Sequence, residues 1–231
     1  MTPRARRWIV VAAIMGLVAA IVWARRDWLT ARLSLIILES SERVEDLRVD
    51  RVVASLVLEP GARVADIGAG TGLFTRPLAR AVGGEGIVYA VDIKPEMLKH
   101  VESTVAAERL DNVRTILAGD DDPRLPERVD LMFLCDTLHH ISGKDSYLRG
   151  LRKYLNPGGR IAIIDFERAS PHLMPSLKYT RDELLAWMGA AGYTLERDLD
   201  FVVDNFFLVY RCDDCPAVSS SPNSKGLIEL D

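Results

Sequence analysis

The sequence predicts an α/β fold built on a doubly wound, largely parallel sheet of seven strands with a C-terminal antiparallel strand. Short apolar runs alternate with amphipathic stretches from residue 58 onward, which is typical of strands connected by crossover helices. The first run leads into glycines at 68, 70 and 72, a tight turn from strand to helix. The last two runs, 194–201 and 205–211, are expected as two closing strands in an antiparallel, hairpin-like pair.

The elements are expected in the following order. Strands are predicted at the apolar runs 64–67, 87–91, 113–120, 129–135, 161–164, 194–201 and 205–211. Helices are predicted at 39–58, 74–82, 95–109, 144–155 and 181–191. Thr180 and Glu183 have the spacing of a capping box at the start of the last helix, and Gly192 follows as its stop.

The glycine loop is compatible with two cofactor classes, a dinucleotide and S-adenosylmethionine. The dinucleotide pattern requires glycine at the sixth place counted from Gly68, but that residue is Leu73. Asp66, two residues before the first glycine, would repel a pyrophosphate and suits a ligand that carries an ammonium and a sulfonium. The loop therefore favours S-adenosylmethionine.

Further carboxylates follow the next strands. Asp92 ends the second run, where it can accept hydrogen bonds from both hydroxyls of a ribose, in either cofactor class. Asp120 ends the third run, where it can accept from the exocyclic amine of adenine. Because ligands of open α/β sheets bind outside the carboxyl ends of the strands, these acids and the glycine loop are expected at one site.

These motifs, in this order, resemble the class I S-adenosylmethionine-dependent methyltransferases, particularly the small-molecule branch with the quinone-biosynthesis and arsenite methyltransferases. The resemblance covers roughly residues 40 to 211 and includes the Pro-Gly-Gly of residues 157–159 before the fifth strand. It implies a Rossmann-like fold, S-adenosylmethionine as methyl donor, and a cofactor site formed by Asp66, Gly68, Gly70, Gly72, Asp92, Ile93, Asp120 and Cys135. Asp121 and Asp122 depart from the family, which more often has a small residue after the acid, and leave open which carboxylate meets adenine.

Two histidines and a proline-containing segment are expected on the acceptor side. His139 and His140 follow the fourth strand, and a His side chain suits proton transfer because its ordinary pKa is near neutrality. We predict His140 as the catalytic base; the alternative is that the rings cap backbone or pack in the core. Residues 169–175, which include His172, are expected to form a lid over the acceptor, with Lys178 and Tyr179 lining it.

The C-terminal cysteines give no metal prediction. Cys212 and Cys215 have no second pair that would complete a tetrahedral site. We expect a solvated pair at the start of a disordered tail, residues 212–231, because the sequence beyond is rich in Ser, Pro and Gly. A soft-ligand or arsenic-binding role is the less favoured alternative.

The N-terminal segment predicts a transmembrane helix. Residues 8–24 carry no charge and, as a helix, would span about 25 Å. Trp8 and Trp23 mark its ends, with a basic flank at 1–7 and Arg25 beyond it. A buried core helix would show a polar face, and a cleaved signal peptide would need a small-residue site in a polar stretch, so a retained anchor is preferred. Residues 25–38 are then a juxtamembrane segment, and the methyltransferase domain is expected at 39–211.

The expected function is a membrane-anchored methyltransferase that acts on a small, apolar or lipid-like acceptor. S-adenosylmethionine is made in the cytosol, so the domain is expected to face the cytoplasm. The net charge of −4 does not indicate nucleic-acid binding, and no nucleic acid is expected as a partner. The alternatives are a non-catalytic, membrane-tethered module that binds S-adenosylmethionine and, less favoured because of Leu73 and Asp66, a dinucleotide oxidoreductase.

Overall fold

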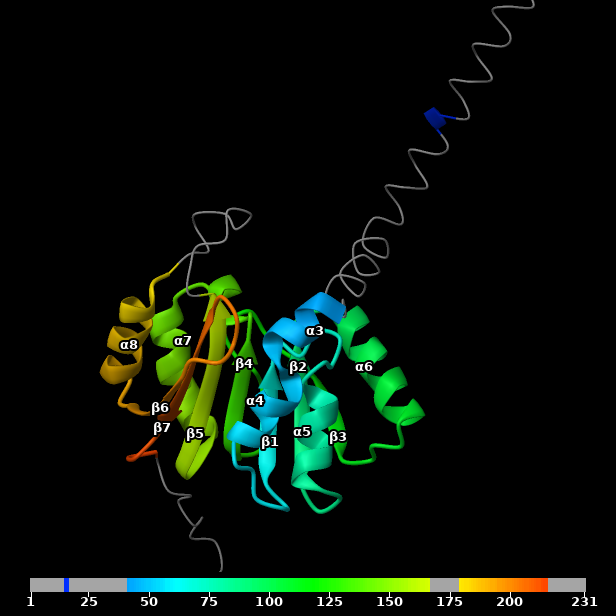
Figure 1. The fold of residues 1–231 in the computed structure, drawn as a ribbon, viewed down its shortest axis with the longest axis horizontal. Helices are drawn as coiled ribbons and strands as arrows, with labels where there is room; N and C mark the ends of the chain where they lie inside the picture. Colours follow the sequence, from blue (N-terminus) through cyan, green and yellow to red (C-terminus); the bar gives the residue numbers. More distant parts are fainter. Residues whose placement is uncertain (1–14, 17–40, 167–178, 216–231) are drawn as a thin grey trace, which may run out of the picture.

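A single seven-stranded sheet forms the centre of the domain (Figure 1). The computed structural model describes residues 15–16, 41–166 and 179–215. The strand order of the sheet is β3-β2-β1-β4-β5-β7-β6. Strand β7 runs antiparallel to both of its neighbours, and the other six strands run parallel to one another. The strands are β1 (Arg63–Ile67), β2 (Ile87–Asp92), β3 (Val113–Leu117), β4 (Val129–Cys135), β5 (Leu155–Phe166), β6 (Thr194–Leu199) and β7 (Asn205–Arg211). The predicted sheet is confirmed, including its antiparallel strand.

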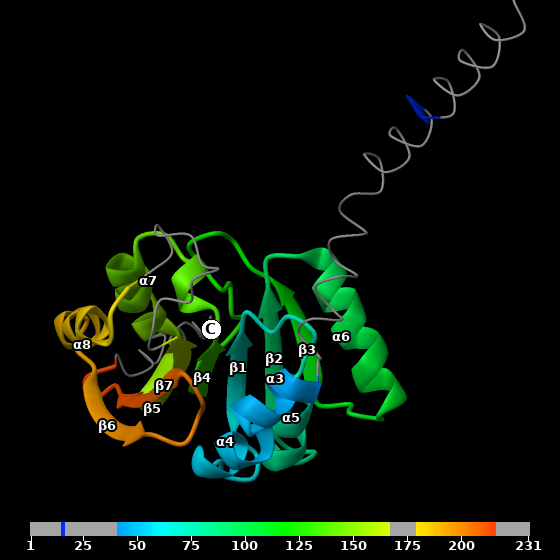
Figure 2. The same cartoon turned by 45° about the horizontal axis from the view of Figure 1, so that its top comes forward.

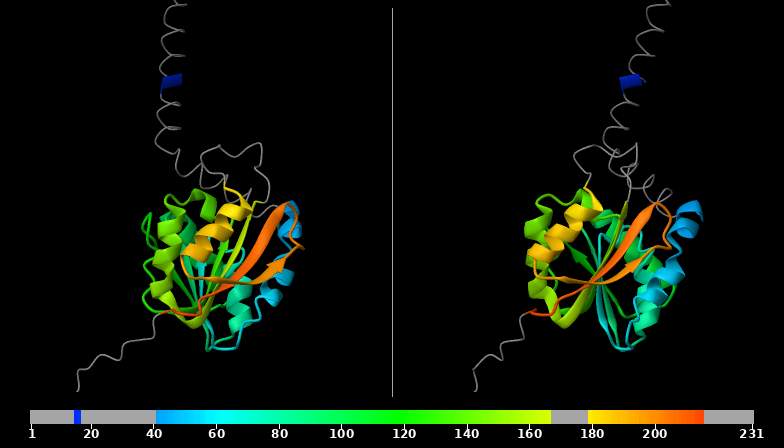
Figure 3. Two further views of the ribbon diagram at one scale, coloured as in Figure 1. Left: turned by 90° about the vertical axis from the view of Figure 1, so that its left-hand side faces the viewer. Right: turned by 60° about the vertical axis from the view of Figure 1, so that its left-hand side comes forward.

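Helices cover both faces of the sheet (Figure 3). One face packs against α4, α5 and α6, and the other against α7 and α8. Neighbouring residues of β1 show why both faces are apolar: Val64 packs on the first face and Ala65 on the second, and both are fully buried. The helices are α3 (Ser41–Leu47), α4 (Val49–Ser55), α5 (Thr75–Val82), α6 (Pro95–Ala107), α7 (Lys144–Leu151) and α8 (Arg181–Ala190).

The single helix expected at 39–58 is two helices. Arg48 adopts a left-handed conformation (φ 47°, ψ 51°), which ends α3 and redirects the chain into α4. The break lets Leu47 and Val53 reach the same apolar cluster on α5 and the sheet. Hydrophobic spacing alone does not reveal this break, because both pieces keep a helical period.

The Pro-Gly-Gly motif is part of β5 and not a turn before it. Gly158, at φ 74°, donates its N–H to the carbonyl of Cys212, and Cys212 donates to the carbonyl of Gly159. The pairing of β4 with β5 shifts register nearby, between Val129 and Leu131. The glycines therefore form an irregular start of a long strand that pairs with the chain after β7.

Cys212 and Cys215 are buried and form a disulfide, so the expectation of a solvated pair is wrong. The carbonyl and amide groups of Cys212 are hydrogen-bonded to Gly158 and Gly159 at the start of β5, which explains why the chain stays packed beyond β7. The predicted anchor at 8–24, apart from residues 15–16, the lid at 169–175 and the tail beyond 215 lie outside the described residues. No helix within the described ranges is long and apolar enough to cross a bilayer.

The predicted capping box gives a first test of the fold. Thr180 accepts a hydrogen bond from the Glu183 N–H at 3.2 Å, and Glu183 accepts from the Thr180 N–H at 2.7 Å. Thr180→Ala is expected to lower the free energy of unfolding by about 1 kcal/mol, because the amide at the third helical position loses its partner. Thr180→Ser keeps the hydroxyl and should lose much less; equal losses in urea denaturation would contradict the capping role.

Candidate functional site

A cavity of about 960 Å³ opens at the carboxyl edge of the parallel strands, which Figure 2 turns toward the reader. Its volume is at the upper end of the range for small-molecule sites, about 300–1,000 Å³. Loops after β1, β2, β3 and β4 form its wall. The cavity collects most of the residues predicted from the sequence: Gly68, Gly70, Asp92, Ile93, Asp120, Cys135, His139 and His140.

The glycine loop is held in a left-handed course. Gly68, Gly70 and Gly72 have φ values of 77°, 53° and 81°, and the N–H groups of Gly68 and Ala69 both donate to the carbonyl of Val91. A Cβ at Gly68 would lie 2.2 Å from Oγ1 of Thr137, on the loop after β4. Gly68 is therefore required by close packing of the β1 and β4 loops, a reason that differs from the ligand approach assumed from the sequence.

Gly68→Ala tests this packing. We expect a loss of unfolding free energy of at least about 2 kcal/mol, from the left-handed backbone and the contact with Thr137. Gly61→Ala is a matched control, since Gly61 has a similar φ of 83° but no atom within 4 Å of the added Cβ. The difference between the two variants isolates the contact. Equal losses in chemical denaturation would show that backbone strain alone makes Gly68 necessary.

Asp92 links two loops of the site through one carboxylate. Its Oδ2 accepts from the Gly70 N–H and its Oδ1 from the Lys94 N–H, both at 2.9 Å. Only 9% of the residue is exposed, and that surface faces the cavity that it lines. Each carboxylate oxygen has a second lone pair, so Asp92 can accept two further hydrogen bonds from a diol in the cavity.

The structure separates the three consecutive aspartates. Asp120 lines the cavity, whereas Asp122 points away from it, to the Lys153 ammonium and the Tyr154 hydroxyl, both at 2.7 Å. The hydrogen bonds from Lys153 and Tyr154 lower the pKa of Asp122 despite partial burial, which opposes them. Asp120 is therefore the one of these two placed to meet a ligand, beside Ile93, an apolar residue that is 56% exposed.

Asp66 is buried behind the loop and does not line the cavity. Its Oδ2 accepts from the Thr75 hydroxyl at 2.6 Å. Burial raises the pKa of Asp66 to about 7, and the Asp92 charge adds to this, while the hydrogen bond from Thr75 opposes it. An ammonium group in the cavity would interact with Asp66 only through the intervening backbone or a water. The role of Asp66 in cofactor binding stays a prediction.

The loop after β4 brings further polar side chains to the cavity. Asp136, at φ 49°, accepts a hydrogen bond from the Asn205 side chain at 3.1 Å and lines the cavity. The 3-10 helix η1 (Leu138–His140) follows, with the rings of His139 and His140 4.1 Å apart. Burial lowers the pKa of His140, and the neighbouring His139 adds to this.

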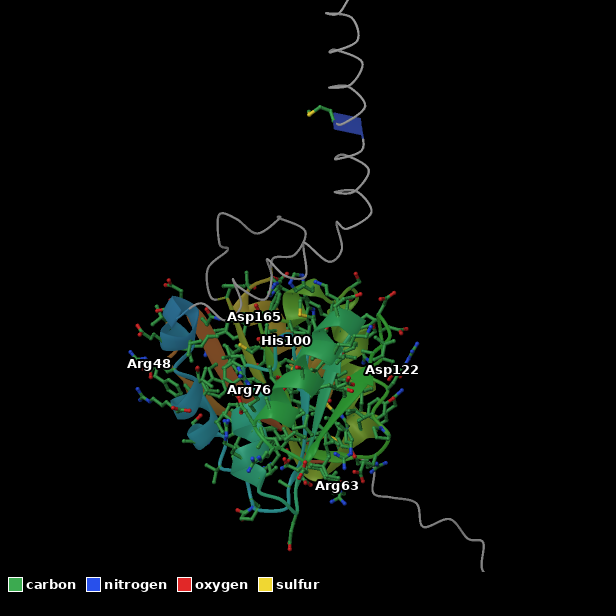
Figure 4. All side chains as sticks on the ribbon, turned by 90° about the vertical axis from the view of Figure 1, so that its right-hand side faces the viewer. Arg48, Arg63, Arg76, His100, Asp122 and Asp165 are labelled. Carbon is green, nitrogen blue, oxygen red and sulfur yellow. A yellow bond between two sulfur atoms is a disulfide. The ribbon has the colours of Figure 1, made fainter. Side chains whose placement is uncertain are left out.

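Asp165 was missed by the sequence argument, although a signal was present. It directly follows the apolar run of 161–164, and the rule applied to Asp66 and Asp92, an acid at a strand end, would have selected it. Its side chain is 1% exposed and makes a 2.8 Å contact with Nδ1 of His139. Figure 4 shows Asp165 toward the upper edge of the domain, opposite Arg63 at the start of β1, so it lies at the cavity end of the sheet.

The residues present fit S-adenosylmethionine. Asp92 has acceptor capacity for two ribose hydroxyls, Ile93 offers an exposed apolar surface for a base, and Asp120 supplies an acceptor beside it. The left-handed loop through Gly70 borders the same cavity. Within the described residues, no group of three or more His, Cys, Asp or Glu is arranged to hold a metal ion.

Comparison with known proteins agrees with this arrangement. A family profile described as a methyltransferase domain matches residues 65–161. Over this range the chain is similar to the class I S-adenosylmethionine-dependent methyltransferases. The ubiquinone/menaquinone biosynthesis C-methyltransferase UbiE of Bordetella avium is 32% identical over 140 residues, which are 57% of this chain and 52% of that protein. The chain thus spans about half the length of the curated relatives it matches.

Solved methyltransferase structures share the fold. A SAM-dependent methyltransferase from Aquifex aeolicus matches with a TM-score of 0.69 and 25% identity, over 77% of this chain and 96% of that chain. The magnesium protoporphyrin IX methyltransferase ChlM of Synechocystis PCC 6803 with bound SAM matches with a TM-score of 0.58 and 23% identity, over 73% and 80%. At that identity the second similarity concerns the fold alone.

Proposed function

We propose that this protein is an S-adenosylmethionine-dependent methyltransferase, anchored in a membrane through residues 8–24, that methylates a small, apolar or lipid-like acceptor. The observation that carries the proposal is the cavity at the carboxyl edge, where Asp92 joins the two loops expected around the ribose. The catalytic domain is proposed to face the cytoplasm, where the methyl donor is available.

The cofactor, when bound, supplies a methyl group on a positively charged sulfur, a leaving group that needs no further activation. The protein's own residues therefore act mainly by alignment and by excluding water. Asp92 and Asp120 would hold the ribose and base ends, and the backbone from Gly68 to Gly70 would confine the methionine end. The methyl group would then lie near the loop after β4, which carries Asp136, His139 and His140.

The acceptor class is supported by the cavity wall and by the sequence before residue 25. Apolar side chains border the cavity on the side of the β4 and β5 ends, including Ile141, Tyr147 and Phe166. A membrane helix at 8–24 would raise the local concentration of any acceptor dissolved in the bilayer. The names of the relatives by sequence refer to quinone biosynthesis, which agrees with an apolar acceptor.

The proposal is tested with the full chain in lipid nanodiscs, incubated with methyl-labelled S-adenosylmethionine and an extract of bacterial membranes. We expect label in the organic-soluble fraction, dependent on the protein, and micromolar binding of S-adenosylmethionine by calorimetry. Label only in the aqueous fraction would overturn the apolar acceptor. Binding without transfer to the lipid, aqueous or protein fraction would favour the alternative, a non-catalytic membrane-tethered module.

A further inference from the structure

A buried cluster at the wall of the cavity joins the chain after β4, the end of β5 and the residues just before α8. Asp165 Oδ1 is 2.8 Å from His139 Nδ1 and accepts the Phe166 N–H at 2.9 Å. Asp165 Oδ2 accepts the Tyr179 hydroxyl at 2.8 Å and the His139 N–H at 3.2 Å. His139 is 6% exposed and Asp165 1%, so one buried carboxylate is surrounded by four polar contacts, three of which are donors without ambiguity.

The contacts determine which nitrogen of His139 carries the proton. A carboxylate has acceptors only, so each group in hydrogen-bond contact with Asp165 must donate to it. Burial, together with the adjacent Asp165 charge, raises the pKa of Tyr179, so its hydroxyl remains a donor. Nδ1 of His139 must then donate to Asp165, and the neutral ring carries its lone pair on Nε2.

Nε2 is the ring nitrogen available to the cavity. His139, His140 and Phe166 all line the cavity. The centroid of the His139 ring lies 4.1 Å from that of His140 and 5.4 Å from that of Phe166. Within the described residues no hydrogen bond of Nε2 is found, while Nδ1 is bonded to Asp165. Because His139 lines the cavity, Nε2 is the ring nitrogen left to accept a proton from a group bound there.

His140 has a different environment. It is exposed, and no hydrogen bond to a carboxylate fixes its ring within the described residues. Burial of part of the ring and the adjacent His139 lower its pKa, so His140 is a weaker base than an ordinary histidine. The geometry thus favours His139 as the base, whereas the sequence had favoured His140.

We propose that His139 is the general base of methyl transfer, with Asp165 and Tyr179 as positioning residues, and that the acceptor is a carbon acid or phenol. The inference rests on the proposed methyltransferase function. A base is needed only where the acceptor atom is a poor nucleophile until it loses a proton, which separates this class from amines and thiolates.

Nε2 of His139 takes the proton of the acceptor, the released electron pair forms the new bond to the methyl carbon, and sulfur keeps the electron pair of the broken bond. The imidazolium, paired with Asp165, then returns its proton to solvent.

The first experiment does not depend on turnover. Long-range nitrogen–proton NMR of the full chain in nanodiscs, with S-adenosylhomocysteine present and histidine labelled, reports the tautomer of His139. We expect protonated Nδ1 and unprotonated Nε2 at pH 8, and Asp165→Asn should produce a mixture of tautomers or the reverse one. A wild-type His139 that carries its proton on Nε2 would overturn the proposal.

The second experiment uses turnover with the membrane extract described above. His139→Gln should lower the rate about 100-fold or more while S-adenosylmethionine affinity stays within about threefold. His140→Gln, the variant of the neighbouring ring, should lower the rate less than His139→Gln does; the reverse order would overturn the base assignment. If the wild type transfers methyl and His139→Gln does so equally well, the base assignment is overturned and the methyltransferase function stands; if the wild type transfers none, both fail.

Discussion

Asp92→Ala is expected to weaken S-adenosylmethionine binding about 100-fold or more. Hydrogen bonds to a charged group contribute about 1.5–3 kcal/mol each, so the loss of two ribose contacts is worth about 3 kcal/mol or more, or about two orders of magnitude in Kd. The variant also removes the acceptor for the N–H groups of Gly70 and Lys94, which loosens both loops. Calorimetric titration of wild type and variant measures the effect.

Asp130→Asn is a matched control for this variant. Asp130 also accepts a backbone N–H, that of Arg63 at 2.8 Å, and contacts the Asn156 side chain at 2.7 Å, but it lies on β4 near the opposite edge of the sheet. It should change stability and leave the affinity for S-adenosylmethionine unchanged. Equal loss of binding in both variants would show that the Asp92 effect is general destabilisation and not removal of a ribose contact.

The sequence was informative where short-range patterns determine structure. The apolar runs and their terminal acids predicted a largely parallel sheet and the edge at which the cavity opens, because the central strands are buried on both faces and their ends align. The capping box was recognised from the spacing of Thr180 and Glu183 alone.

Features that depend on contacts between distant residues were not predicted. The packing of Gly68 against Thr137 and the contact of His139 with Asp165 join residues 69 and 26 positions apart, and no local pattern encodes them. The disulfide between Cys212 and Cys215 is local, but its burial results from pairing of the chain with Gly158 and Gly159. The choice between His139 and His140 likewise depends on the strand that carries Asp165, which the sequence analysis ended at residue 164, two residues before the observed end of β5 at Phe166.

Asp66 is expected to make the stability of the domain fall as pH rises. The native carboxyl keeps its proton up to about pH 7, whereas the unfolded one ionises near pH 3.8. Between these values the unfolded state binds fewer protons, so the free energy of unfolding decreases with increasing pH. A shift of about three pKa units corresponds to about 4 kcal/mol across this window.

Asp66→Asn removes that titration and keeps the size of the side chain. The unfolding free energy of the variant minus that of the wild type should therefore increase by about 4 kcal/mol between pH 4 and pH 8, measured by urea denaturation at each pH. Comparison at each pH cancels the other titrating groups, which both proteins share. A difference that stays constant over this range would mean that Asp66 is ionised in the native state, held so by Thr75.

The same carboxyl gives a test of its predicted role toward the cofactor. If the positive charge of S-adenosylmethionine acts on Asp66 through the glycine loop, binding favours the ionised form and lowers its pKa. Binding at pH 6 should then release close to one proton, detected by calorimetry in buffers of different ionisation enthalpy, and affinity should increase from pH 6 to pH 8. In Asp66→Asn both effects should vanish; proton release that persists in the variant would assign it to another group of the site.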